Sequence, residues 1–158
     1  MSKSTHAQTA AMIRKHIKSL GIKAQVTSDS YAGGNSVRVS LTDETPAVCA
    51  KIEEYVNQFQ YGSFNGMQDL YEYTNTRNDI PQVKYVFVNN HASPEMRQKI
   101  WDFMKGYYAG MEGCPADVKD AQNYLNPNFG GYADQEIWRL FSGGFGREDF
   151  WLNQGVSK

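Results

Sequence analysis

The stretch TDETPAVCAKIEEYVNQF, residues 42–59, contains the clearest helix start in the chain. Thr45 is suited to the N-cap position, and Pro46 fits the first helical position, where no backbone N–H donor is needed. Val48, Ile52 and Phe59 follow at helical spacing, so one side of this helix is expected to be buried. Strand-like segments on both sides of the helix place it inside a mixed fold.

The segment before this helix predicts a helix and a hairpin. Residues 7–20 carry apolar side chains at helical spacing and indicate an amphipathic helix. Residues 23–27 and 36–41 alternate between apolar and polar side chains, as half-buried strands do. The sequence SYAGGN between them, residues 30–35, supplies glycines for a chain reversal, so the two strands are expected to form a hairpin.

The segment after the helix predicts two more strands, at 69–75 and 83–90, and a third helix that begins after Ser93. The order α-β-β-α-β-β-α predicts an α+β fold with a four-stranded, mainly antiparallel sheet and helices mostly on one face. We expect this domain to span residues 1–111. Residues 112–158 then form a helical, aromatic-rich extension packed on it, with short helices at 116–125 and 133–142.

Charge is nearly balanced over the 158 residues, with a net charge of −1. This argues against a wholly basic nucleic-acid binder and against an acidic DNA mimic. Residues 1–40 nevertheless carry six basic residues against one acidic residue, and residues 41–80 carry seven acidic against two basic. Either the two segments form complementary faces within the fold, or Arg14, Lys15 and Lys18 form a basic patch that meets an anionic partner.

Motifs of catalysis and cofactor binding are missing from the sequence. The three histidines have no partners at metal-ligand spacing, and the paired glycines lack the Lys-Ser/Thr of a phosphate loop. We therefore expect a protein that is not an enzyme and has no cofactor or metal. The polar N-terminal segment, two unpaired cysteines and the lack of an apolar run of roughly 18 residues favour a cytoplasmic protein without a membrane partner.

Aromatic residues allow two interpretations of the second face of the sheet. If Tyr85 and Phe87 face the helices, Lys84 and its alternating neighbours face the other way, beside Arg38 and a tyrosine of the strand at 69–75. An open face with aromatic and basic groups resembles a platform on which single-stranded bases stack. Alternatively, the C-terminal segment covers this face with four aromatic residues, Trp138, Phe141, Phe145 and Trp151.

The C-terminal aromatic residues are too numerous for two short helices to bury. We expect Trp138 and Phe141 to dock on the same chain. Phe145, Phe150 and Trp151 are expected to be the more exposed set, and therefore an interface with a partner or with a second copy of the chain.

Three motifs, SYAGGNSVRVSLTDETP, YGSFNGMQDLYEYT and VKYVFVNNHAS, together resemble a known family. The chain is similar to the large polyvalent protein-associated domain family, the twenty-ninth of that series, over roughly residues 8–93. The resemblance rests on the following residues: Val37, Arg38, Val39, Ser40, Thr42, Asp43, Gly62, Ser63, Phe64, Asn65, Gly66, Met67, Tyr71 and Tyr73. It implies an accessory protein of phages or conjugative elements and brings no catalytic mechanism.

The resulting hypothesis is a non-enzymatic accessory protein of mobile-element origin that acts on a host protein or nucleoprotein, with Tyr71 and Tyr73 among its interface residues. The alternative is direct nucleic-acid binding, through Arg14, Lys15 and Lys18 of the first helix or through Arg38 on an open sheet face. The segment YGSFNGM itself is expected to be structural, with a positive φ at Gly62 or Gly66.

Overall fold

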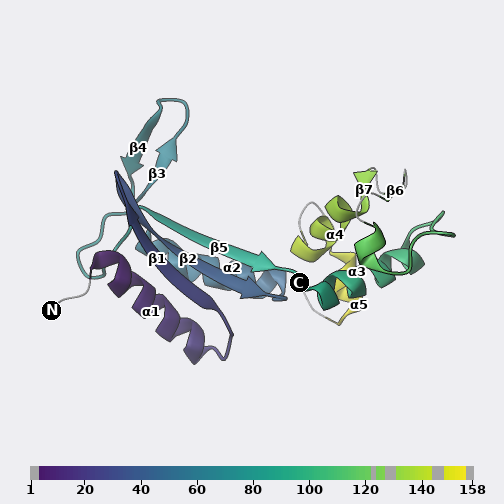
Figure 1. The fold of residues 1–158 in the computed structure, drawn as a ribbon. Coiled ribbons are helices and arrows are strands. Elements are labelled where there is room, and N and C mark those ends of the chain that lie inside the picture. The colour runs from purple at the N-terminus through teal and green to yellow at the C-terminus, as the bar shows by residue number, and fades with distance from the viewer. Residues whose placement is uncertain (1–3, 122–123, 127–130, 144–147, 156–158) are drawn as a thin grey trace. The chain divides into compact units, whose positions relative to one another are not determined.

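The computed structural model describes residues 4–121, 124–126, 131–143 and 148–155. The chain divides into two compact units, the first made of residues up to 44 together with 48–91, the second of residues 45–47 together with 92 onward. Helices and strands both occur (Figure 1), which confirms the α+β class. The division differs from the boundary after residue 111 that we drew from the sequence.

The first unit contains a long sheet, two helices and a separate hairpin. Its elements are α1 (Thr5–Ser19), β1 (Gln25–Tyr31), β2 (Gly34–Thr42), α2 (Pro46–Val56), the 3-10 turn η1 (Asn57–Phe59), β3 (Gly62–Asn65), β4 (Leu70–Tyr73) and β5 (Tyr85–His91). The expected hairpin of β1 and β2 is present, with Val26 opposite Val39 and Ser28 opposite Val37.

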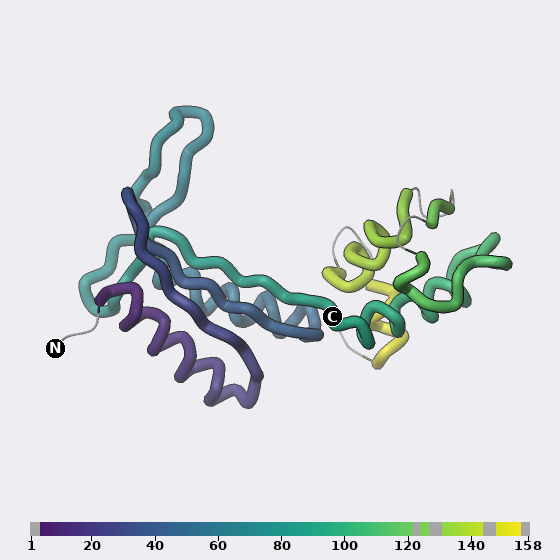
Figure 2. Tube along the Cα trace, in the orientation of Figure 1, coloured from purple at the N-terminus to yellow at the C-terminus, as the bar shows by residue number. Residues whose placement is uncertain are grey.

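The prediction of a single four-stranded, mainly antiparallel sheet is wrong. The main sheet has three strands in the order β1-β2-β5, and β5 runs parallel to β2, with Val37 opposite Val86. β3 and β4 pair only with each other and project from one end of the long strands (Figures 1 and 2). Because the chain from β2 to β5 passes through α2, the two strands meet in parallel, as a helical crossover requires.

Both helices of the first unit pack on the same face of the main sheet. Ile13 and Ile17 of α1 and Ile52 of α2 join Val37 and Val39 of β2 in one buried cluster. Strand side chains alternate between faces, so the neighbours of these valines lie on the opposite side. This second side, which we call the open face, carries side chains from all three strands: Gln25, Thr27, Asp29, Tyr31, Ser36, Arg38, Ser40, Thr42, Tyr85, Phe87, Asn89 and His91.

The second unit is a small helical assembly with two short strands. Its elements are α3 (Pro94–Tyr107), the 3-10 turn η2 (Val118–Ala121), β6 (Leu125–Asn126), β7 (Gly131–Tyr132), α4 (Ala133–Ser142) and α5 (Asp149–Asn153). Ser93 caps α3 as expected, its Oγ accepting the Met96 N–H at 3.1 Å. The helix expected at 116–125 is only the short η2. The fully buried Trp101 of α3 lies in the core of this unit and donates to the carbonyl of Pro115 at 2.8 Å.

Phe150 and Trp151 are buried, so the expectation that they are the exposed set is wrong. The Trp151 indole N–H donates to the carbonyl of Phe141 at 2.7 Å, which fixes α5 against α4. Phe141 is buried as expected, whereas Trp138 is 58% exposed because it falls off the buried stripe of α4. Phe145 lies outside the described residues.

Candidate functional site: the open face of the sheet

Five aromatic side chains form a continuous row from the hairpin onto the open face. Tyr73 stacks on Tyr61 with ring centroids 5.3 Å apart, and Tyr71 meets both rings edge-on. Tyr71 also meets Tyr85 edge-on at 5.6 Å, and Tyr85 stacks on Phe87 at 5.9 Å. We call Tyr61, Tyr71, Tyr73, Tyr85 and Phe87 the aromatic row. The row runs from β4 to β5 without a gap, so it can present several ring faces to one extended ligand.

Two cations lie over rings of the aromatic row. The Arg38 guanidinium carbon lies 5.3 Å from the centroid of Phe87, its register partner on the neighbouring strand. The Lys84 ammonium lies 5.0 Å from the centroid of Tyr71 and 5.8 Å from that of Tyr85. All three distances lie within the range of cation–π attraction. The open face therefore combines aromatic surface with positive charge, which are the two features that anionic aromatic ligands require.

Hydrogen bonds between side chains and the backbone hold the β3–β4 hairpin against the beginning of β5. The Tyr71 hydroxyl donates to the carbonyl of Lys84 at 2.7 Å. The Gln60 amide bridges the two segments, since its nitrogen donates to the Gly62 carbonyl and its oxygen accepts the Val86 N–H, both at 2.8 Å. These bonds fix Tyr61, Tyr71 and Tyr85 as one cluster, although β3 and β4 do not join the main sheet.

Gly62 allows this approach because it has no side chain. A Cβ at this position would press into the carbonyl oxygen of Glu72 and lie 2.5 Å from the Tyr71 ring. Neither Gly62 nor Gly66 has a positive φ, so that expectation is wrong; the left-handed residue of this hairpin is Asp69, with φ 53°. Phe64 does not enter the core either and is 55% exposed.

Two tyrosines of the row, Tyr61 and Tyr71, have a raised pKa and keep their protons at physiological pH. Partial burial, followed by the neighbouring Tyr61, Tyr85 and Tyr73, raises the pKa of Tyr71 to about 12. Burial, followed by Tyr73, Tyr31 and Tyr85, raises the pKa of Tyr61. A phenol that keeps its proton adds no negative charge, so the positive character set by Arg38 and Lys84 is retained across the neutral range.

The other end of the open face is polar and hollowed. A wide cavity of about 760 Å³ is lined by the side chains and backbone of Gly21, Lys23, Ala24, Gln25, Ser40, Thr42, Glu44 and His91. The Asn90 amide holds the loop before α2 in place, accepting the Glu44 N–H at 3.1 Å and donating to the Glu44 carbonyl at 2.7 Å. Hydroxyl, amide and imidazole groups here can hydrogen-bond to a ligand that also stacks on the aromatic row.

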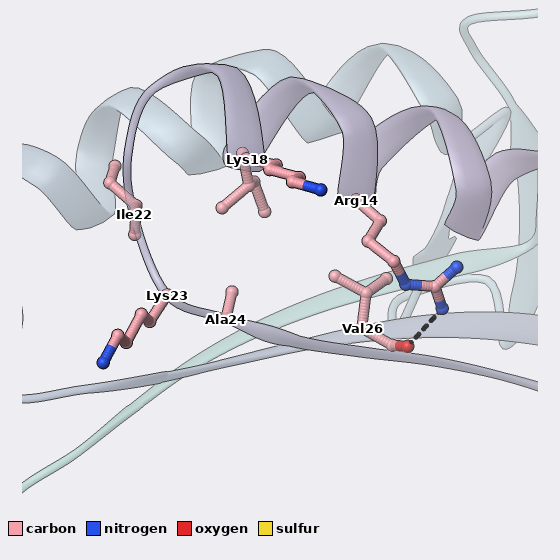
Figure 3. Close-up of a pocket in the computed structure, with 7 residues that line it drawn as sticks. Arg14, Lys18, Ile22, Lys23, Ala24 and Val26 are labelled. Carbon is pink, nitrogen blue, oxygen red and sulfur yellow. Dashed lines mark hydrogen bonds between the residues drawn. The ribbon is translucent and has the colours of Figure 1, made fainter.

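A second, smaller pocket of about 240 Å³ lies between α1 and the start of β1 (Figure 3). It is lined by Arg14, Ile17, Lys18, Ile22, Lys23, Ala24 and Val26, and Arg14 donates to the Val26 carbonyl at 2.7 Å. The four basic residues singled out from the sequence are therefore not one cluster. Arg14 and Lys18 line this pocket, Arg38 lies on the open face, and Lys15 is exposed on α1 without lining the pocket.

The interface residues predicted from the sequence lie in two different places in the structure. Tyr71 and Tyr73 both belong to the aromatic row, and Phe150 and Trp151 belong to the buried core of the second unit. The interface residues predicted from the sequence did not include Tyr61, Lys84, Tyr85 or Phe87. The alternation of Tyr85 and Phe87 with Val86 and Val88 was visible in the sequence, but it did not decide which set faces the helices. In the structure the valines face the helices.

Within the described residues, no group of three histidine, cysteine or acidic side chains is arranged to hold a metal ion. No helix in the described part of the chain is long and apolar enough to cross a membrane. The open face offers ring stacking and cation–π contacts to a ligand.

A family model described as large polyvalent protein associated domain 29 matches residues 4–97, more than half of the chain. The chain belongs to this family. The match confirms the resemblance drawn from the motifs, and it contains the whole of the aromatic row, the polar cavity and the basic pocket. No curated protein and no solved structure matches the chain. The family domain therefore includes the first unit and the beginning of α3.

Proposed function

We propose that this chain is a non-enzymatic accessory protein of a phage or mobile element, and that its open face binds single-stranded nucleic acid, free or as part of a host nucleoprotein. The observation that carries the proposal is the aromatic row with Arg38 and Lys84 stacked on its rings. Membership of a family associated with large polyvalent proteins supports the accessory role.

Single strands suit this face better than duplexes. Unpaired bases present their ring faces to aromatic side chains, whereas a duplex buries those faces in its own stack. The phosphates that accompany each base are attracted by Arg38 and Lys84. Asp29 is the one acidic side chain that β1, β2 and β5 contribute to the open face, so repulsion of the backbone is small.

The chemistry of Cys49 fits a binding role, because its thiol is not activated as a nucleophile. Burial, followed by the nearby carboxylates of Glu53 and Glu44, raises the pKa of the Cys49 thiol to about 11. Its reactive thiolate is therefore scarce at neutral pH. Cys49 acts as a partly buried apolar side chain of α2 that packs against the core of the first unit.

Phe87→Ala should weaken binding of a fluorescein-labelled oligothymidylate by about 5- to 150-fold, because loss of one stacked base costs ~1–3 kcal/mol. Fluorescence anisotropy measures the affinity. Trp138→Ala is the matched control, since it removes another exposed aromatic ring from the second unit, and its affinity should equal that of the wild type. An absence of binding at low salt, or equal losses in both variants, would refute the proposal.

Arg38→Gln should reduce the salt dependence of binding. Each phosphate contact contributes ~0.7 to the slope of log affinity against log salt for a single strand. The slope measured for the Arg38→Gln variant should therefore be lower by about that amount. The wild type should also bind a duplex of the same sequence more weakly than the single strand at every salt concentration. An unchanged slope would show that Arg38 does not contact the backbone.

A protein partner is the second candidate, favoured by the tip of the β3–β4 hairpin. Met67 is 98% exposed, and Phe64 and Leu70 beside it are about half exposed. Such an apolar tip suits a protein contact, including one with a second copy of the chain. Sedimentation velocity of the wild type and of Met67→Ser distinguishes self-association from binding to a different protein. If the wild type sediments as an oligomer and the variant as a monomer, the tip mediates self-association. If both sediment as monomers, self-association is excluded.

A further inference from the structure

The pocket between α1 and β1 brings two cations together over an apolar floor. Arg14 and Lys18 of α1 line the pocket together with Ala24 and Val26. Figure 3 shows the Arg14 guanidinium beside the Val26 carbonyl, the Lys18 side chain near the helix, and Lys23 pointing away from the pocket. The volume of about 240 Å³ is several times the ~30 Å³ that one water occupies in the liquid. A small anion of several heavy atoms therefore fits between the helix and the strand.

The cations of this pocket are not neutralised by ion pairs within the part of the chain that the structure describes. Among residues 4–121, 124–126, 131–143 and 148–155, no carboxylate lies within ion-pair distance of Arg14, Lys18 or Lys23. Arg14 is nevertheless held in position, because one of its N–H groups donates to the Val26 carbonyl at 2.7 Å. A guanidinium has five N–H donors, so a fixed Arg14 still has donors for a ligand.

The C-terminal end of α1 does not cancel this charge. A helix C-terminus carries the equivalent of roughly half a negative charge, which alone would explain a lysine in the last turn. Here the last carbonyls are already occupied: His16 and Ile17 accept the N–H of Leu20, and Lys18 accepts that of Gly21. Two full positive charges exceed the remaining partial charge, so the pocket stays favourable for an anion.

We infer that this pocket is a phosphate site, and that it holds a backbone phosphate of the strand that stacks on the open face. Lys23 and Ala24 line both this pocket and the wide cavity at the polar end of the open face, so the two are adjacent across the start of β1. Guanidinium and ammonium donors reaching one space from α1 match the several oxygens of a phosphate. The phosphate site stands on its own; its occupation by the strand rests on the proposed function.

Titration with inorganic phosphate and with pyrophosphate tests the site without any nucleic acid. In amide NMR spectra of the full chain, signals from residues 14–26 should shift saturably, and pyrophosphate should bind more tightly because it carries more charge. Lys18→Gln should weaken this binding about tenfold, the loss expected for one charge-assisted contact. The Lys18 side chain makes no hydrogen bond or ion pair within the described residues, so we expect this variant to keep the fold.

Lys15→Gln is the matched control, because it removes the same charge from an exposed position on α1 outside the pocket. Phosphate affinity should be unchanged in it. Linear, unsaturable shifts in the wild type, or equal losses in the Lys15 and Lys18 variants, would overturn the phosphate site.

Oligonucleotide affinity separates the two sources of phosphate. Lys18→Gln should lower the affinity for a natural single strand but not for a methylphosphonate strand, whose backbone is uncharged. If the variant loses phosphate binding and keeps full affinity for the natural strand, the pocket does not hold a backbone phosphate of that strand. It then binds a free phosphate compound. If phosphate binds while Phe87→Ala has no effect on oligonucleotides, the proposed function fails and the phosphate site stands.

Discussion

Phe150→Ala should destabilise the second unit by about 3–5 kcal/mol, the usual cost of removing a buried aromatic side chain. Phe150 is fully buried. Its ring lies edge-on to Phe103 of α3 at 5.7 Å and packs against Trp151 at 5.1 Å. The substitution leaves a cavity where α3 and α5 meet. Urea unfolding followed by tryptophan fluorescence measures the loss, because all three tryptophans lie in this unit.

Trp138→Ala is the control for this experiment. It removes a larger aromatic side chain from α4, but this side chain is 58% exposed, so the expected cost is below about 1 kcal/mol. A comparable loss in both variants would contradict the assignment of Phe150 to the core and of Trp138 to the surface. The same result would revive the idea that Phe150 and Trp151 serve as an exposed interface.

Gly62→Ala should release the β3–β4 hairpin from the beginning of β5. The new methyl group would press into the backbone carbonyl of Glu72 and the Tyr71 ring. A backbone group cannot move aside as a flexible side chain can, so the cost is expected at the upper end of the ~1–3 kcal/mol typical of overpacking. Faster hydrogen exchange of the amides in β3 and β4, with β1 and β2 unchanged, is the expected observation.

Gly66→Ala provides a matched glycine only four residues away. A Cβ at Gly66 meets nothing within 4 Å, and its φ is not positive, so stability should be unchanged or slightly increased through the less flexible unfolded chain. Equal effects at the two glycines would show that hairpin flexibility, and not the contact with Glu72, makes Gly62 necessary. Because Tyr61, Tyr71 and Tyr73 belong to this hairpin, Gly62→Ala should also weaken oligonucleotide binding.

Local signals in the sequence predicted the helices and the first hairpin well. Ser93 and the proline after it determine the start of α3, and α2 starts at Pro46 as its sequence indicates. The glycines of SYAGGN close the β1–β2 turn, where Gly33 has φ 91°. These features depend on residues a few positions apart, so a single sequence contains the information that decides them.

Sheet order could not be predicted in the same way. β4 looked like a neighbour of β5 because it precedes β5 in the chain, but β5 pairs with β2, about fifty residues earlier. Long-range pairing depends on which buried faces fit together, and VKYVFV is apolar on both sides of the strand. Tyrosine and phenylalanine suit either a core or an exposed binding face, so the pattern alone did not orient β5.

The candidate site depends on the same long-range pairing. Arg38 meets Phe87 only because β2 and β5 are neighbours, and Lys84 meets Tyr71 only because the hairpin docks beside β5. The sequence indicated basic residues and aromatic residues separately. It assigned Arg14, Lys15 and Lys18 to one patch because they share a helix, whereas the structure separates Lys15 from the pocket of the other two.

The most direct test of the central claim is an amide NMR titration of the full chain with an unlabelled oligothymidylate of about eight nucleotides, within the usual site size of ~4–16. We predict saturable shifts concentrated at Tyr71, Tyr85 and Phe87 of the aromatic row and at its two cations, Arg38 and Lys84. Shifts confined to the second unit or to the hairpin tip at Met67, or no shifts at low salt, would contradict the assignment of the open face as a single-strand binding surface.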